Sequence, residues 1–421
     1  MQQRIWGVAG QGRRLEPIPA GILARMRRAG QRASAQHAGV ARSSVGHDYA
    51  FLVGTVVDEA TLQRAEVGAA RCGVAVHDVL VTAGWVRQAD YAAALARDLG
   101  VPLADRRAAI ELDEAALETP LETGLLARLD GRPCHILCAT GAAPADLRRH
   151  AVALQARGIE VHLAPRYVLD AALEAQGQQD YINRAVSGLW RDRPVSSAFS
   201  RAPSWQVLTG VAFAGLIIGG VAVLPGATLA ALTGLMALSF LSITLLRLFA
   251  LQRALAGPDR TGRQAGPRRR LPDRQLPVYS VLVPLFREAN VLSGLIRSLR
   301  ALDYPPAKLE ILLVLEAIDT ETRAALLAID LPGNVRVVLV PDQGPRTKPK
   351  ALNYALQLAR GEYVVVYDAE DRPQADQLRR AVDVFRGAPP ELGCLQAQLN
   401  IYNPSQSWLT RGLMAQTPVR F

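Results

Sequence analysis

Eight charged side chains in the C-terminal third of this chain have the types and spacing for phosphate and metal chemistry. Each lies at or shortly after the end of a short apolar run, and together they are Glu288, Glu316, Asp319, Lys348, Lys350, Asp368, Glu370 and Asp371. Carboxylates brought together repel one another unless a divalent cation lies among them. Mg²⁺ or Mn²⁺ prefers such oxygen ligands, and Mg²⁺ is often shared with substrate phosphates. Because lysines supply positive charge to a diphosphate, these residues predict a metal-assisted site for a nucleoside diphosphate.

Each group also has a plainer interpretation when it is taken alone. An Asp-x-Glu-Asp sequence after a strand, as in 368–371, is often a turn or a helix cap. The two lysines fit a solvated loop, and Glu316 fits a charged strand end. Their occurrence at successive strand ends, in this order, favours one shared site.

The elements that must position these side chains alternate between strands and helices from Leu276 onward. Strands are predicted over 278–283, 309–315, 335–340 and 362–367, and helices over 290–302, 321–329, 350–360 and 374–385. Such alternation with short connections is typical of a parallel, doubly wound α/β sheet. Because these sheets bind ligands at the carboxyl ends of their strands, the eight side chains should meet there.

An uncharged stretch of 42 residues, Trp205 to Leu246, precedes this region. As one helix it would be about 63 Å long at about 1.5 Å per residue, twice the roughly 30 Å of a bilayer core. Pro225-Gly226 lies near its middle. We therefore expect a two-helix transmembrane hairpin, 207–224 and 227–246. A pair of buried helices in a soluble protein is the alternative, but neither helix has a polar face.

The charge pattern bears on the partners of the chain. The formal net charge is +10, and only three of the 48 basic residues are lysines. A basic balance suggests an anionic partner, but nucleic acid would require a basic patch with interleaved aromatic residues, and none is visible. Arginines flank the hairpin instead, so both soluble parts of this multi-pass membrane protein should be cytoplasmic. The basic linker 252–276 is expected on anionic membrane lipid, with an ordinary solvated linker as the alternative.

A small mixed α/β module is predicted before the hairpin. Helices are expected over 59–71, 76–83, 88–99, 145–157 and 168–176, and strands over 135–139 and 159–163. Glycines follow several of these helices, as is typical of helix C-termini. Residues 1–46 contain no apolar core of a signal peptide. We expect a disordered basic leader there, or an arm on anionic lipid.

This module resembles the N-terminal domain of type II secretion and pilus assembly ATPases. The resemblance lies in "VAVHDVLVTAGWVRQADYAAALARDLGVPLAD" and "HILCATGAAPADLRRHAVALQARGIEVHLAPRYVLDAAL". Some members bind cyclic di-GMP, but 74–78 stands where the family usually has Arg-Leu-Gly. No G-x-x-x-x-G-K-[ST] loop occurs in the chain, so the ATPase half of that family is absent. The resemblance leaves a non-catalytic function open, namely membrane-tethered nucleotide sensing or interaction with polysaccharide-secretion components.

Residues 277 to about 411 resemble the first part of a membrane-bound family-2 glycosyltransferase, in the group of cellulose and other exopolysaccharide synthases. The motifs are "SVLVPLFREANVL", "LEILLVLEAIDTET", "TKPKALNYAL", "YVVVYDAEDRP" and "LQAQLNIYNPSQSWLTR". The resemblance implies a partial GT-A (Rossmann-like) domain. It also implies inverting, metal-dependent transfer of a sugar from a nucleotide-sugar donor, such as a UDP-sugar, to a glycan acceptor.

The resemblance also implies individual roles. Glu288 and Glu316 would contact the uridine or its ribose, and Lys350 would approach the diphosphate with Lys348 beside it. Asp319 is a weaker donor contact, because Ile318 stands where the subgroup usually has another acid.

The implied metal ligands are Asp368 and Glu370, with Asp371 adjacent. The family's general base lies in a later Thr-Glu-Asp motif, and a Gln-x-x-Arg-Trp motif holds the acceptor. Neither motif occurs in this sequence, so we expect a C-terminally truncated chain with no catalytic base and little activity alone. The predicted order is leader 1–46, N-terminal module 47–185, linker 186–204, hairpin 205–251, basic linker 252–276, transferase part 277–413 and divergent tail 414–421.

Overall fold

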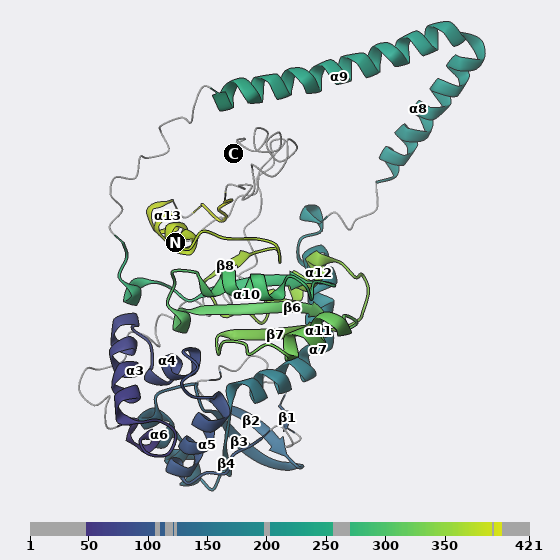
Figure 1. Cartoon of the computed structure of the whole chain (residues 1–421). Helices are drawn as coiled ribbons and strands as arrows, with labels where there is room; N and C mark the ends of the chain where they lie inside the picture. The colour runs from purple at the N-terminus through teal and green to yellow at the C-terminus, as the bar shows by residue number, and fades with distance from the viewer. Residues whose placement is uncertain are drawn as a thin grey trace. The chain divides into compact units, whose positions relative to one another are not determined.

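The computed structural model of the chain (Figure 1) describes residues 48–105, 110–113, 121, 124–197, 203–255, 270–389 and 391–397. The described residues divide into two compact units. The first contains residues 48–193 and 271–392, and the second contains the two long apolar helices. The predicted leader 1–46, the tail 414–421 and most of the basic linker lie outside the described residues.

The first unit begins with the predicted N-terminal module. Helices α3 (Glu59–Cys72), α4 (Val76–Thr82), α5 (Gln88–Leu99) and α6 (Pro144–Gln155) confirm the predicted helices to within two residues at each end. The sheet order is β1 (Ile110–Leu112), β2 (Leu125–Leu129), β3 (Arg132–Cys138) and β4 (Val161–Ala164). Strands β1 and β2 were not predicted. Both pair antiparallel, and only β3 and β4 pair parallel.

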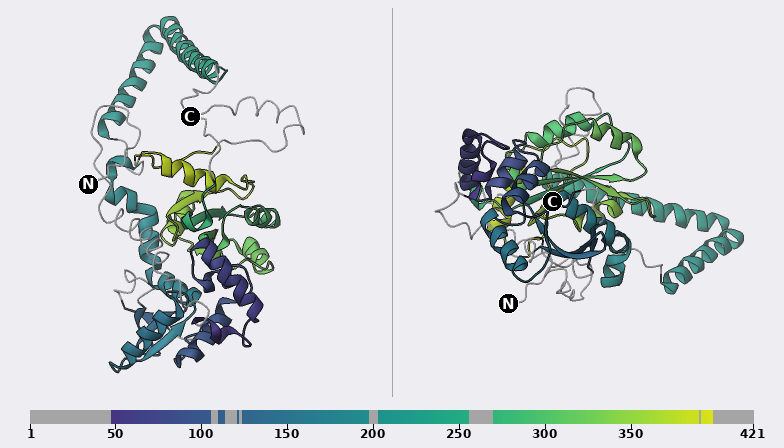
Figure 2. Two further views of the ribbon diagram at one scale, coloured as in Figure 1. Left: turned by 90° about the vertical axis from the view of Figure 1, so that its left-hand side faces the viewer. Right: turned by 90° about the horizontal axis from the view of Figure 1, so that it is seen from below.

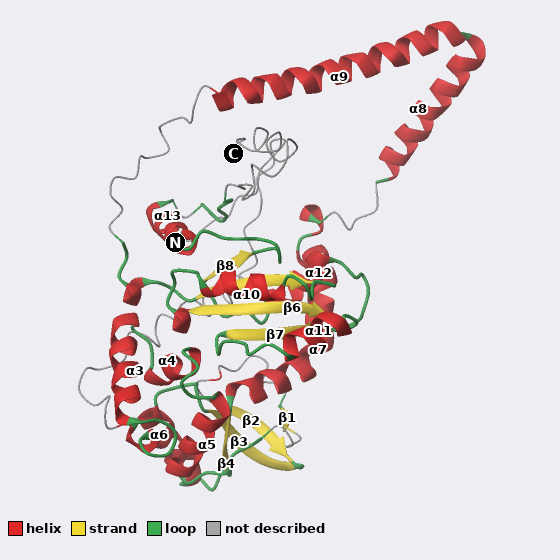
Figure 3. Cartoon of the chain, in the orientation of Figure 1, coloured by secondary structure: helices red, strands yellow, loops and turns green. Residues whose placement is uncertain are grey.

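The second sheet of this unit is the predicted parallel sheet, called here the C-terminal sheet (Figure 3). Its strands are β5 (Tyr279–Leu285), β6 (Leu309–Glu316), β7 (Val335–Val340) and β8 (Tyr363–Val366), in the order β7-β6-β5-β8. Every neighbouring pair is parallel. The chain therefore leaves β5 toward β6 and β7 and returns to the other side of β5 as β8, which confirms the doubly wound α/β prediction.

Both faces of the C-terminal sheet are buried, so its central strands are almost continuously apolar. The first face carries Val281, Val283, Ile311 and Leu313, which pack with residues from helices α10 (Leu292–Arg300), α11 (Thr320–Leu327) and α13 (Gln377–Gly387). The second face carries Leu282, Leu312, Val314, Val338 and Val340 and packs on α12 (Lys348–Leu356) and on α7. The alternation of neighbouring residues between the two faces follows from the two-residue period of a strand.

Helix α7 (Arg166–Asp192) corrects one sequence prediction. The predicted helix ended at Gln176, just before Gly177, but the helix continues for about four more turns. Glycine inside a helix costs about 1 kcal/mol. Burial of Ile182 and Ala185 against the second face of the C-terminal sheet offsets this cost. Residues 186–192 of the predicted linker are therefore helical.

The second unit contains helices α8 (Ser204–Val223) and α9 (Pro225–Leu255), which meet at a turn and diverge from it at an angle in both views of Figure 2. Pro225 starts α9, where proline is well tolerated. Both helices are long and apolar enough to cross a membrane, by length and composition only. The second helix runs well past the predicted end at Leu246.

Candidate active site

A cavity of about 340 Å³ opens at the carboxyl end of the C-terminal sheet. It lies where the strand order reverses beside β5, the position at which open α/β sheets bind their ligands. Five of the eight predicted site residues line it: Glu288, Glu316, Lys348, Asp368 and Glu370. The structure thus brings together side chains that are up to 82 positions apart in the sequence.

The other three predicted residues do not line the cavity, and each forms a hydrogen bond to a residue of the lining or next to it. Lys350 is buried, with a side chain only 2% exposed, and its Nζ donates to Glu316 Oε2 at 3.0 Å and to the Gln343 carbonyl at 2.9 Å. Asp371 Oδ2 accepts a hydrogen bond from the Asp368 amide at 2.8 Å, which closes the turn after β8. Asp319 caps helix α11.

The lysine loop before α12 is set by local sequence. Thr347 caps the helix by accepting from the Lys350 amide, and Pro349 occupies its first turn, where a missing amide hydrogen costs nothing. This start directs the side chain of Lys348, which is half exposed, into the cavity. Lys348 forms an ion pair with Asp368 across the cavity. The helix N-terminus also contributes partial positive charge, which favours an anionic ligand.

Glu288 has an unsatisfied carboxylate at the same site. Its Oε2 is buried and has no hydrogen-bond partner among the described residues. Burial, together with the nearby charges of Glu370 and Asp368, raises the pKa of Glu288. A buried carboxylate oxygen without a partner costs free energy, so this corner of the cavity favours a hydrogen-bond donor or a cation.

The carboxylates that line the cavity bear on whether a divalent metal fits there. Among the described residues, no three His, Cys, Asp or Glu side chains form a complete metal cage. Asp368 and Glu370 both line the cavity and offer oxygen ligands. Mg²⁺ is commonly held by one or two carboxylates plus substrate phosphates rather than by an all-protein cage, so the two residues fit a metal that is shared with a bound diphosphate.

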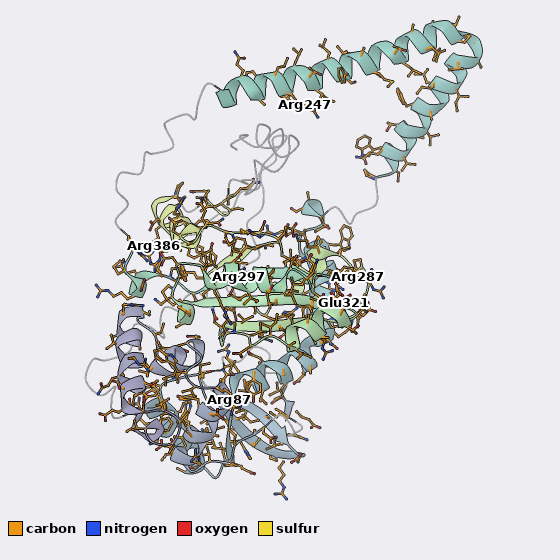
Figure 4. The ribbon with its side chains drawn as sticks, in the orientation of Figure 1. Arg87, Arg247, Arg287, Arg297, Glu321 and Arg386 are labelled. Carbon is orange, nitrogen blue, oxygen red and sulfur yellow. The ribbon has the colours of Figure 1, made fainter. Side chains whose placement is uncertain are left out.

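The sequence analysis did not predict the hydrogen bonds that hold the backbone at Arg287 and Glu288. Arg287 has a left-handed backbone conformation, with φ of 57°, and its amide donates to Asp319 Oδ2 at 2.6 Å. The Glu288 amide donates to Thr322 Oγ1 at 3.0 Å. Arg287 lies at the same end of the molecule as Glu321 of α11 in Figure 4. The sequence carried a signal only for the capping role of Asp319, since aspartate is a preferred N-cap residue.

Residues 277–420 match the family model described as "Glycosyltransferase like family 2". A beta-monoglucosyldiacylglycerol synthase from Trichormus variabilis is 29% identical over 142 residues, which are 34% of this chain and 30% of that protein. Cellulose synthase 2 from Novacetimonas hansenii is 28% identical over 129 residues, which are 30% of this chain and 8% of that protein. The match therefore spans less than a third of the length of these relatives.

Among solved structures, the chain is similar to a mannosyltransferase from Pyrobaculum calidifontis in complex with GDP-Man and Mn²⁺. The identity is 29%, the match covers 37% of this chain and 43% of that one, and the TM-score is 0.28. The family assignment rests on the sequence match and agrees with the parallel sheet and the cavity at its carboxyl end. Residues 277–420 of this chain are a glycosyltransferase family 2 domain.

Proposed function

We propose that this chain binds a nucleoside diphosphate sugar and takes part in transferring its sugar to a growing exopolysaccharide or another glycan. The observation that supports this most directly is the meeting of Lys348, Asp368, Glu370 and the unsatisfied Glu288 around one cavity. Opposite charges meet around this cavity, which supports binding of a metal-bound diphosphate. The family match supports the reaction class.

Each residue has a proposed task in donor binding. Lys348 exchanges its ion pair with Asp368 for the diphosphate, and Asp368 and Glu370 hold a Mg²⁺ or Mn²⁺ ion. The metal, when bound, neutralises charge on the leaving nucleoside diphosphate. Glu288 accepts hydrogen bonds from the donor's hydroxyl or base groups, and the Lys350–Glu316 pair keeps the cavity wall rigid. Transfer with inversion also requires a general base, which we do not assign to any described residue.

We further propose that α8 and α9 anchor the chain in the bacterial inner membrane, with both soluble parts in the cytoplasm. No described side chain of α8 is buried, and its mean composition is strongly apolar. In water such a helix would expose its whole apolar surface at a cost of about 25 cal/mol per Å². Its 20 residues span about 30 Å, which matches a bilayer core.

The donor proposal is tested by calorimetry on the full chain in detergent. We expect UDP-glucose, UDP-GlcNAc or GDP-mannose to bind with Mn²⁺ and to dissociate when EDTA is added. Asp368→Asn should weaken binding at least about tenfold, because it removes one charged ligand. Asp376→Asn is the matched control, since Asp376 is half exposed and pairs with Arg380 outside the cavity. The proposal fails if no nucleotide sugar binds, or if both variants bind like the wild type.

A further inference from the structure

Helix α7 joins two parts of the first unit that the sequence analysis had placed in separate modules. Its first half packs on the N-terminal sheet, which is formed by β1 to β4. Leu169 is buried there, and Gln176 Nε2 donates to the Leu112 carbonyl at 2.8 Å. Its second half packs on the C-terminal sheet through Ile182 and Ala185. At 27 residues, or about 40 Å, the helix is long enough for both contacts.

The second face of the C-terminal sheet requires a covering helix where α7 lies. Its first face is covered by α10, α11 and α13, whereas the crossovers between its own described strands place only α12 on the second face. Leu312 and Val338 on that face are fully buried in a cluster that includes residues of α7. Burial of a leucine or valine contributes about 1.5–3 kcal/mol. The N-terminal module thus supplies part of the hydrophobic core of the transferase domain.

The contact between α7 and α12 has polar as well as apolar parts. Gln357 Nε2 donates to the Tyr181 carbonyl at 2.8 Å, and Asn353 Nδ2 donates to the Ala185 carbonyl at 3.1 Å. The rings of Tyr181 and Tyr354 meet edge to face, with centroids 6.0 Å apart. These directional contacts fix the position of α12 along α7, in addition to holding the two helices together.

A second group of contacts fixes the adjoining strand. Arg336 on β7 bridges Asp170 at 3.3 Å and Glu174 at 2.8 Å, both on α7. The three side chains are largely buried, so this network is screened less than a surface ion pair. Strand β7 leads directly into the loop 341–347 that precedes α12.

A series of hydrogen bonds continues from α7 to the cavity wall. Gln343 Nε2 donates to Gln179 Oε1 on α7 at 3.3 Å. The Gln343 carbonyl accepts from Lys350 Nζ, which in turn donates to Glu316 on the wall of the cavity. Lys348 begins the same helix and lines the cavity itself.

We infer that α7 is a positioning element for the donor site, through which the N-terminal module sets the affinity of the transferase domain for its nucleoside diphosphate. The inference rests on the proposed function, because the ligand of the cavity is the proposed donor. Ligand binding in the cavity and the packing of α7 on the C-terminal sheet are then coupled, and such coupling is reciprocal. A change that weakens the packing of α7 on the C-terminal sheet therefore weakens ligand binding, and a bound ligand strengthens that packing.

The test uses the full chain in detergent with UDP and Mn²⁺ as the probe. Ile182→Ala should raise the dissociation constant of UDP–Mn²⁺ by about tenfold, within the usual range of allosteric coupling. Gln179→Ala keeps the apolar contact and should raise it by about threefold, as expected for one hydrogen bond. Arg184→Ala is the matched control, since Arg184 is an exposed residue of the same helix, and it should bind like the wild type.

Hydrogen exchange supplies a readout that a purely structural role of α7 would not change. Binding of UDP–Mn²⁺ to the wild type should slow exchange of the α7 amides at 178–190, which lie outside the cavity. Without ligand, Ile182→Ala should speed exchange at 348–356, and Arg184→Ala should not. The inference is overturned if folded Ile182→Ala and Gln179→Ala bind UDP–Mn²⁺ normally, or if ligand leaves α7 exchange unchanged. Absence of any nucleotide binding by the wild type would contradict the proposed function instead, and exchange at 348–356 would still decide whether α7 holds α12.

Discussion

Replacement of Asp319 by alanine tests the interpretation that this residue supports the proposed donor site through its backbone contacts and does not contact the ligand. The carboxylate is buried and accepts from the Arg287 amide at 2.6 Å and from the Thr322 amide at 3.1 Å. It therefore holds both the start of α11 and the loop that carries Glu288. Asp319→Ala removes both hydrogen bonds.

The expected loss of stability follows from these two contacts. Loss of a helix N-cap costs about 1 kcal/mol. The Arg287 amide, left without its acceptor, costs about 1–3 kcal/mol. Since Arg287 is held at a positive φ that a non-glycine residue rarely adopts, the freed loop should also relax and move Glu288. We expect a total loss of about 2–4 kcal/mol together with weaker donor binding.

The pH dependence of this loss is set by the Asp319 carboxyl. Burial favours its protonated form, but hydrogen bonds from Arg287 and Thr322 outweigh burial, so its pKa lies below the ordinary 3.8. A carboxyl with a lowered folded-state pKa stabilises the fold above its unfolded-state pKa, and this stabilisation is lost as the pH falls through the folded-state value. The difference between wild type and Asp319→Ala should therefore be full at neutral pH and shrink below pH 3.8.

The assay is urea unfolding of the full chain in detergent, followed by circular dichroism. Asp376→Ala is the control, because Asp376 occupies the same capping position on α13 but makes no capping hydrogen bond and only an exposed ion pair with Arg380. That control should lose less than about 1 kcal/mol. Equal stability of the two variants, or a difference that does not change with pH, would refute the role given to Asp319.

Three further predictions concern the same domain. Lys348→Ala should change stability by less than about 1 kcal/mol, because its ion pair with Asp368 is half exposed, yet calorimetry should show clearly weaker UDP–Mn²⁺ binding. Burial lowers the pKa of Lys308 from 10.5 to about 8. The unfolded chain then binds more protons between these values, so stability should rise from pH 8 to 10.5, and Lys308→Met should abolish that rise in urea titrations. Gly361→Ala would place its Cβ 2.4 Å from the Ser280 backbone nitrogen, so thermal melting should reveal a loss of about 1–3 kcal/mol from overpacking.

The sequence alone determined much of this protein, because local patterns carry local structure. The apolar runs over 278–283 and 309–315 predicted the two buried parallel strands that the structure has at Tyr279–Leu285 and Leu309–Glu316, and the uncharged stretch predicted two apolar helices interrupted at Pro225. Strand ends predicted where the charged side chains meet, since parallel strands present their carboxyl ends at one edge. Five of the eight predicted site residues line the cavity for this reason.

Only the tertiary structure decided what the remaining residues do. Lys350, Asp319 and Asp371 carry the right charges for ligands, but each is engaged by a group distant in sequence or by a turn amide. The continuation of α7 past Gly177 likewise depends on a sheet more than 100 residues further along the chain. Charge and periodicity are visible in a sequence, whereas the partner that a side chain meets depends on how distant segments pack, which the sequence pattern does not display.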